Sequence, residues 1–428
     1  MRDLVLSGMA LIAATYGLAR FGYGLFLPQF TEEFAMVPAV SGAIQAGSFL
    51  SYCLAAAIAA RVDAGPRAFV ALAGGTAAAG SLGVALAPHA AVLAPGVVLA
   101  GAGAGFATPG LVTLIERHLV GARRESAQTV VNSGTGAGLV AAAALSLLAI
   151  GHWRIAWAVI AVTAAVAALA TLRADAVAAG AGSSAGGGSL IRSGPPASSG
   201  SPVSSGPPAG PGAASGPGRS AGDAAPSSRA GLRALMAPLV IPVVAALLAG
   251  ASSAAIWTFG RSVMADARPD QPLYSLLAWM VLGVLGMVGA IAAKLVQAWS
   301  LRTAWTLTAA AMAGATVLLG VAPGASWAAH LSMCLFGAGY TALSGVLIVW
   351  AGRARPECAA EGTVVLFIAL ALGQAAGSLL LGALLGVTSE MTTFLVAGGL
   401  GLAAIVPTLH RRIRHDDGVS TSMSGSVA

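Results

Sequence analysis

The chain has 428 residues, of which 57% are hydrophobic and 9% charged, and its mean hydropathy is +0.85. This composition lies far outside the range of soluble globular domains and predicts an all-α membrane protein with many spans. The formal net charge of +7 comes largely from basic residues in short loops between apolar runs, so it indicates membrane topology and not nucleic-acid binding.

Runs of about 20 apolar residues predict twelve transmembrane helices. Six lie in the first half, near residues 4–28, 39–60, 68–88, 91–114, 127–150 and 153–172. Six more lie near residues 235–259, 273–296, 303–322, 325–350, 361–386 and 391–409. We therefore expect two six-helix bundles, over residues 1–173 and 231–410.

The segment between the two sets of spans, residues 174–230, is dominated by Gly, Ala, Ser and Pro. Such a composition cannot bury a core, so we expect a disordered cytoplasmic linker there and a cytoplasmic tail over residues 411–428. Most of the 22 basic residues fall on the same side as the termini, which the positive-inside rule places in the cytoplasm. The scarcity of lysine beside abundant Ala and Gly favours a GC-rich bacterial genome, and hence a bacterial cytoplasmic membrane.

The two halves contain similar stretches in the same order. Residues 57–61 (AIAAR) match 290–294 (AIAAK), 101–103 (GAG) recur at 337–339, and 134–138 (GTGAG) resemble 373–377 (GQAAG). The common order predicts a six-plus-six duplication with two pseudo-symmetric bundles. Such repeats flank a central site near the middle of the membrane.

The loop between the second and third spans, residues 59–67 (AARVDAGPR), is similar to the Gly-x-x-x-Asp-Arg-x-Gly-Arg-Arg loop of the major facilitator superfamily. The chain resembles this family of secondary transporters over nearly its whole length. It keeps Asp63 and Arg67 but lacks the leading Gly and the first Arg. The resemblance implies that Asp63 faces the start of the eleventh helix and that Arg67 pairs with Glu116, forming an inner gate. The alternative is a solvated loop whose arginines only set topology.

Three short motifs are similar to the YbfB/YjiJ-like bacterial branch of that family, which supplies no substrate: residues 20–24 (RFGYG), 132–134 (NSG) and 372–374 (LGQ). The Gly-Pro signature that drug–proton antiporters carry in the fifth span is missing. The fourth span also lacks the arginine of many proton-coupled members. These departures disfavour proton-driven drug export.

Arg20 lies well inside the first apolar run, about 12 Å from Pro28 at a rise of about 1.5 Å per residue. A guanidinium left in hydrocarbon costs about 3 kcal/mol on insertion scales, so we expect it to face the bundle interior. It is either a substrate contact or the partner of an outer carboxylate such as Glu32. Arg261, near the outer end of the seventh span, is expected to reach the interface instead.

Tyrosines and amides concentrate in a subset of the spans and are missing from the third. Because a polar side chain facing lipid goes unsatisfied, these residues indicate a central cavity. The expected substrate-binding residues are Arg20, Tyr16, Tyr23, Gln45, Tyr52, Asn132, Trp257, Tyr340 and Gln374. An interhelical hydrogen bond or core contact is the alternative for each. No Asp or Glu lies deep in a span, so the site suits an anion or neutral polar solute and leaves the coupling ion open.

These observations predict a secondary transporter that moves a small solute by alternating access. The alternatives are an exporter of amphipathic compounds, which would use the aromatic residues and not Arg20, and a transport-dead membrane sensor or scaffold. The six histidines lie at span ends, in a loop or in the tail, and the three cysteines are far apart. We therefore expect no enzyme, metal or cofactor, and a monomer whose partners are its solute and the lipid bilayer.

Overall fold

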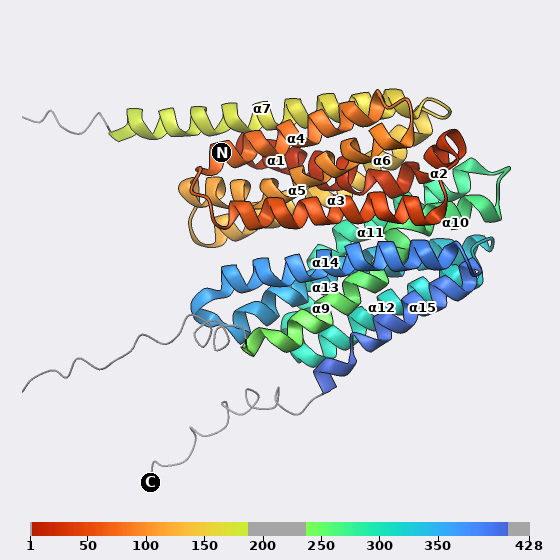
Figure 1. The fold of residues 1–428 in the computed structure, drawn as a ribbon. Helices are drawn as coiled ribbons and strands as arrows, with labels where there is room; N and C mark the ends of the chain where they lie inside the picture. The colour runs from red at the N-terminus through yellow and green to blue at the C-terminus, as the bar shows by residue number, and fades with distance from the viewer. Residues whose placement is uncertain (1, 187–236, 410–428) are drawn as a thin grey trace, which may run out of the picture.

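The computed structural model describes residues 2–186 and 237–409, which form two bundles of helices lying side by side (Figure 1). Every regular element within these residues is a helix. The ends at Arg2, Gly186, Ala237 and Leu409 lie toward one end of the molecule. We call that end the terminal side and the opposite end the distal side.

The first bundle begins with a span built of three consecutive elements: α1 (Arg2–Ile12), the π-helix η1 (Ala13–Arg20) and α2 (Gly22–Phe34). It continues through α3 (Pro38–Ala59), α4 (Pro66–Ala85), α5 (Ala90–His118), α6 (Gly121–Leu148) and α7 (Trp153–Gly186). The N-terminal half is thus a bundle of six spans, as the apolar runs predict.

The second bundle opens in the same way, with η2 (Ala237–Leu239), α9 (Val240–Ala254), the π-helix η3 (Ala255–Phe259) and α10 (Gly260–Ala267). It continues through α11 (Pro272–Ala298), α12 (Leu301–Val321), α13 (Ser326–Ala354), η4 (Pro356–Cys358), α14 (Ala359–Leu385), α15 (Glu390–Ala403) and η5 (Val406–Leu409). Eleven of the spans are long and apolar enough to cross a membrane, and α11 contributes a shorter apolar stretch, Pro272–Met287. The prediction of twelve membrane helices is therefore confirmed.

Proline and serine fix where several of these helices begin. Pro38, Pro66 and Pro272 each occupy the first turn, where a missing backbone N–H costs nothing. Ser300 and Ser389 precede α12 and α15, and their hydroxyls accept hydrogen bonds from the backbone N–H groups of Thr303 and Thr392. The short distal and terminal loops then return the chain to the bundle.

The repeated glycine motifs make the same kind of close helix contact in both halves. Gly134 and Gly138 of α6 face the carbonyl oxygens of Met9 and Ala13, where the fifth span crosses the first. In α14 Gly373 and Gly377 face those of Leu247 and Ala251, where the eleventh span crosses the seventh. A Cβ atom at any of the four would overlap backbone atoms, so glycine is required for the helices to approach this closely.

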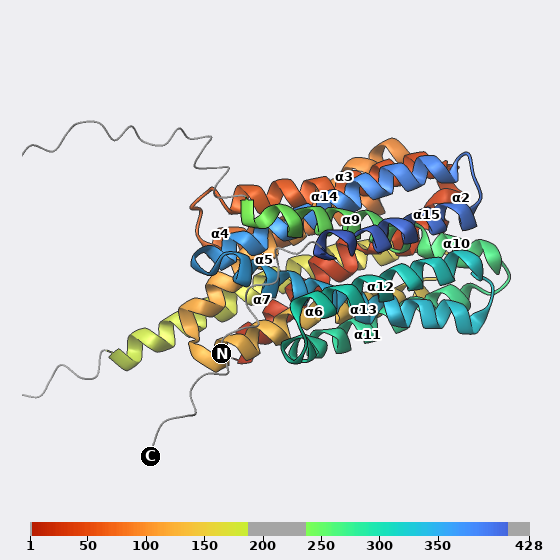
Figure 2. The ribbon, with the colours of Figure 1, turned by 90° about the horizontal axis from the view of Figure 1, so that it is seen from below.

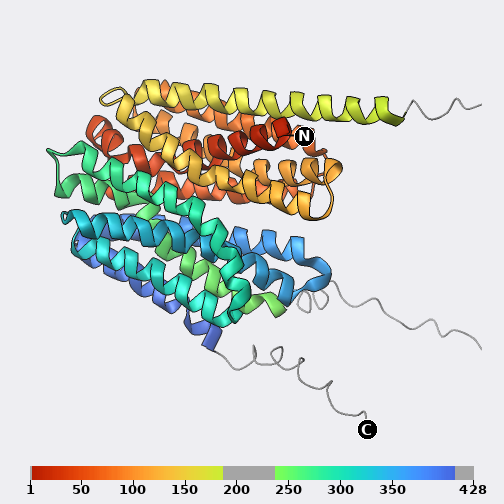
Figure 3. The ribbon, with the colours of Figure 1, turned by 180° about the vertical axis from the view of Figure 1, so that it is seen from behind.

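The two halves meet along two helix pairs, α3 with α14 and α6 with α11 (Figures 2 and 3). Glycine again sets the contact. Gly42 of α3 faces the carbonyl oxygen of Ser378, and Gly382 of α14 faces that of Pro38. Gly136 of α6 and Gly283 of α11 face each other's carbonyl oxygens. At these points the seam between the halves brings backbone against backbone.

Helix α7 runs beyond the expected end of the sixth span, so residues 174–186 are helical where the composition suggested a linker. This stretch is rich in alanine, the strongest helix former, and its Asp175 makes two polar contacts with the rest of the half. The remainder of the expected linker, 187–230, and the tail from residue 411 lie outside the described residues.

Replacing a crossing glycine tests the close helix contact. Gly373→Ala should lower the free energy of unfolding by about 1–3 kcal/mol, because the added Cβ overlaps the Leu247 carbonyl group. Gly314 of α12 has open space around it, so Gly314→Ala should raise stability by up to about 1 kcal/mol through helix propensity alone. Thermal unfolding of the purified protein in detergent measures both, and equal effects would contradict the contact.

Candidate substrate-binding site

The first and seventh spans each change from α-helix to π-helix near the centre of the bundle. η1 is followed by Phe21-Gly22, and η3 ends at Phe259, which Gly260 follows. A π segment accommodates an extra residue in the turn and recurs at functional sites. These two segments carry Arg20 and Trp257 into the region where the halves meet.

Arg20 is buried, with 4% of its surface exposed, at the end of η1. Its Nη2 donates a hydrogen bond to Oε1 of Gln374, 3.2 Å away on α14 of the other half. Four ring centroids surround its Cζ atom, those of Tyr52 at 4.0 Å, Phe21 and Phe49 at 5.1 Å, and Tyr16 at 5.6 Å. Such cation–π contacts compensate part of the cost of burying a guanidinium. Its Nε has no hydrogen-bond partner among the described residues.

Gln374 connects Arg20 to the C-terminal half. Its Nε2 donates hydrogen bonds to Oη of Tyr340 at 3.1 Å and to Oγ of Ser253 at 3.4 Å. Gln374 and Ser253 are fully buried, whereas Tyr340 is half-buried. Tyr16, the half-buried tyrosine on the opposite half, shares a 2.9 Å hydrogen bond with the hydroxyl of Thr108. The two tyrosines and Thr108 are therefore the partly accessible members of this group.

Trp257 of η3 packs between the two halves. Its ring stacks on Phe21 with a centroid distance of 4.0 Å, and it meets Phe336 and Tyr340 edge-on at 5.3 and 5.2 Å. The Nε1–H of Trp257 is buried and unpartnered in the described part of the chain. Phe336 was not among the expected site residues, because one phenylalanine in an apolar run has no feature that marks it.

The remaining expected residues occupy different places. Gln45 of α3 is fully buried and neither atom of its amide has a partner among the residues described. Tyr23 donates a hydrogen bond to the carbonyl oxygen of Ser41 at 3.1 Å within its own half. Asn132 is exposed on α6. The structure thus brings six of the nine together, namely Tyr16, Arg20, Tyr52, Trp257, Tyr340 and Gln374.

Arg261 does not extend to the membrane surface as expected. It is 4% exposed, and its Nη1 donates hydrogen bonds across the seam to the carbonyl oxygen of Leu25 and, at 2.7 Å, to Oε1 of Gln29. Glu32, the alternative partner considered for Arg20, is exposed near the distal end of α2. The two buried arginines therefore both connect the halves, Arg20 centrally and Arg261 nearer the distal side.

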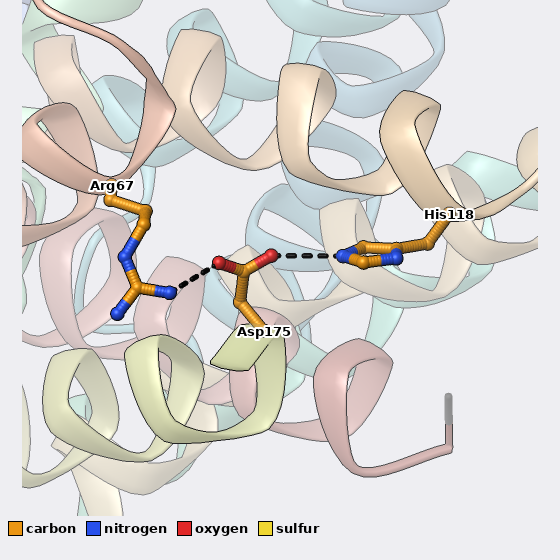
Figure 4. A network of polar contacts seen from close by, with 3 residues as sticks. All are labelled: Arg67, His118 and Asp175. Atoms are coloured by element: carbon orange, nitrogen blue, oxygen red, sulfur yellow. Dashed lines mark hydrogen bonds and ion pairs between the residues drawn. The ribbon is translucent and has the colours of Figure 1, made fainter. Parts of the chain in front are cut away.

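The expected pair of Arg67 with Glu116 is not formed. Arg67 instead binds Asp175, with 2.6 Å between Nη1 and Oδ2, and Nε2 of His118 lies 2.9 Å from Oδ1 of the same carboxylate (Figure 4). Glu116 lies 3.5 Å from Arg124 and is 45% exposed. The continued helix α7 is the reason, since it places Asp175 between the start of α4 and the end of α5. Asp63 is exposed in the loop before α4.

Comparison with known proteins identifies the family. The model of the Major Facilitator Superfamily matches residues 9–378, so the chain belongs to this superfamily. A comparison with curated proteins gives no match. The likeness to the YbfB/YjiJ-like branch stays a prediction.

Solved transporter structures share the fold. A D-xylose–proton symporter superposes with a TM-score of 0.69 at 13% identity, covering 95% of this chain and 97% of its own. The xylose transporter XylE from E. coli, in a partially occluded inward-open conformation, gives 0.67 at 13% identity over 95% and 96%. The nucleoside transporter NupG gives 0.64 at 13% identity over 95% and 98%. At this identity the likeness establishes the fold alone.

The contacts of Asp175 predict a larger effect there than at Glu116. Asp175→Ala should lower the free energy of unfolding by about 1–3 kcal/mol, because it removes two hydrogen bonds to a charged, largely buried carboxylate. Glu116→Ala, which removes an exposed ion pair, should cost less than about 1 kcal/mol. Thermal unfolding compares the two variants. A larger loss of stability in Glu116→Ala than in Asp175→Ala would contradict the pairing of Arg67 with Asp175.

The hydrogen bonds of Arg261 should hold the distal ends of the halves together. Arg261→Met should speed amide hydrogen exchange in α2 by about tenfold or more, since bonds to charged groups contribute about 1.5–3 kcal/mol. Arg268→Met is the control, because Arg268 binds Gly324 and Gln271 within its own half. Mass spectrometry of exchanged peptides is the measurement, and unchanged α2 exchange in Arg261→Met would refute the role.

Proposed function

We propose that the chain is a secondary transporter that moves a small anionic or neutral polar solute by alternating access of its two halves. The observation that carries this proposal is Arg20, a buried guanidinium at the seam whose hydrogen-bond partner is an amide oxygen. Membership of the superfamily and the transporter folds of the compared structures support transport. The charge of the site supports the solute class.

The electrostatics of the seam favour an anion. Among the described residues the buried charged side chains are Arg20, Arg261 and Asp175. Asp175 is bound to Arg67 and His118 on the terminal side, so no buried carboxylate balances Arg20. A buried charge without an opposite charge costs several kcal/mol, and the surrounding rings and the Gln374 amide compensate only part of this cost. An entering carboxylate or phosphate would supply the opposite charge and bind the guanidinium fork. An organic cation would be repelled.

The contacts between the halves suit a reversible rearrangement. Arg20 and Gln374 belong to opposite halves. A solute that accepts the hydrogen bond of the Arg20 guanidinium would therefore replace a bond between the halves. In the proposed cycle Asp63, Arg67 and Glu116 form the gate on the terminal side. In the present conformation Arg67 is bound to Asp175. The positive-inside distribution supports a cytoplasmic terminal side, in a bacterial membrane.

A thermal-shift screen of the purified chain tests the proposal. Small carboxylates, inorganic phosphate, polyols and amphipathic drugs are compared on the wild type and on Arg20→Ala. A bound anion at 100 times its dissociation constant should stabilise the wild type by about 2.7 kcal/mol, and this gain should vanish in Arg20→Ala. Arg268→Ala, altered at an arginine of the distal side, should keep the gain.

The screen also separates the main alternative. If only amphipathic drugs stabilise the protein, and they stabilise Arg20→Ala equally, the anion proposal is wrong and an exporter of amphipathic compounds takes its place. Counterflow of the stabilising compound in proteoliposomes then distinguishes a transporter from a protein that only senses its ligand.

A further inference from the structure

Aromatic side chains concentrate around one charge. They make up 6% of the chain, yet eight of them gather about Arg20, in direct contact with it or through one another. The N-terminal half contributes Tyr16, Phe21, Phe49 and Tyr52, and the C-terminal half contributes Trp257, Trp279, Phe336 and Tyr340. The guanidinium contacts the N-terminal rings directly, and the C-terminal rings connect to it through Phe21 and Gln374. The cluster thus combines one charged anchor with flat apolar surfaces.

Hydrogen-bond donors in this cluster remain unused. Nε of Arg20 and Nε1 of Trp257 are buried without a partner among the described residues. Phe21 connects the two side chains, because its ring contacts Arg20 and stacks on Trp257. An unmade buried hydrogen bond costs about 1–3 kcal/mol. Donors left open beside a guanidinium are matched by a bound carboxylate, which accepts hydrogen bonds at both oxygens.

The charge of the cluster limits the ligand to a single anionic group. Arg20 is the buried cation that the rings surround, and the second buried cation, Arg261, is bound to Leu25 and Gln29. A dianion would bring a second charge with no partner into a dry environment, which is unfavourable.

The neutral polar groups argue against a polyol or sugar as the preferred ligand. Those beside Arg20 bind one another: Gln374 donates to Tyr340 and Ser253, and Tyr16 is paired with Thr108. A ligand with many hydroxyl groups would have to break these bonds to satisfy its own. A flat apolar body needs none of them and gains by stacking on the rings.

We propose that the solute is an aromatic monocarboxylate, with Arg20 binding its carboxylate and the rings of Trp257 and Tyr340 packing on its body. This inference rests on the proposed function, because it specifies the ligand class of the same site. Tyr16 and Tyr340 are the half-buried rings of the cluster, and the others are buried.

Calorimetric titration of the full chain in nanodiscs with four matched probes tests the inference. Benzoate carries both features, cyclohexanecarboxylate has the charge and a puckered body, acetate has the charge alone, and benzamide has the ring alone. Benzoate should bind about threefold to tenfold more tightly than cyclohexanecarboxylate, the equivalent of the 0.5–1.5 kcal/mol of an aromatic pair, and more tightly still than acetate. Benzamide should not bind measurably.

Two variants separate the anchor from the lining. Arg20→Lys keeps the charge but loses the fork, so it should weaken all three carboxylates and leave their ranking unchanged. Tyr340→Leu should abolish most of the benzoate preference over cyclohexanecarboxylate. Tyr274→Leu is its control, because Tyr274 binds the Pro323 carbonyl oxygen and packs on His330 at the distal end. The ranking of ligands is read within each variant, so a general loss of stability does not imitate the result.

The possible failures differ. If inorganic phosphate or acetate binds as tightly as benzoate and still requires Arg20, the aromatic class is wrong while the proposed anion transport stands. If xylitol binds and the carboxylates do not, the class is again wrong and the solute is a neutral polar one. If no probe or anion shows dependence on Arg20, this inference and the anion proposal fail together.

Discussion

Helices in this protein approach one another until backbone atoms touch, and the architecture depends on that contact. In a bilayer, apolar side chains gain nothing by leaving lipid for protein, so close packing and small residues must hold the helices together. Glycines supply the contact within each half, as at Gly138 and Gly377, and between the halves, as at Gly42 and Gly136. Because the two halves repeat one arrangement, their first and seventh spans face each other with their π segments near the centre.

The pair of Arg20 and Gln374 breaks this symmetry. Arg20 belongs to the N-terminal half. The C-terminal half contributes the amide of Gln374, which binds Arg20, and a group of rings about Trp257. The N-terminal half therefore holds the guanidinium and the four rings that contact it, and the C-terminal half holds the amide and the remaining rings. The proposed solute site would be complete only when both halves contribute, so binding there would depend on the relative position of the halves.

Hydropathy predicted all twelve helices because a bilayer requires an apolar run of full length for each span, and the repeated glycines predicted the duplication. The interior position of Arg20 followed from the cost of a charge in lipid. The burial of Arg261 at the seam did not follow from the sequence, because its partner Gln29 comes from the other half. Asp175 was assigned to a linker because alanine-rich sequence does not reveal a tertiary ion pair. Asn132 was expected beside these residues and is exposed, because a helix of Gly and Ala shows little difference between its faces.

The π segment before Arg20 has a geometric consequence. A wide turn holds one residue more than an α-helical turn, and an α-helix advances by about 100° per residue. If the wide turn moves along the span, every side chain that it passes rotates by about that angle while the ends of the helix stay in place. The orientation of Arg20 is thus tied to the location of a backbone defect. Changing which way this side chain points needs no translation of the first span and no unfolding of its ends.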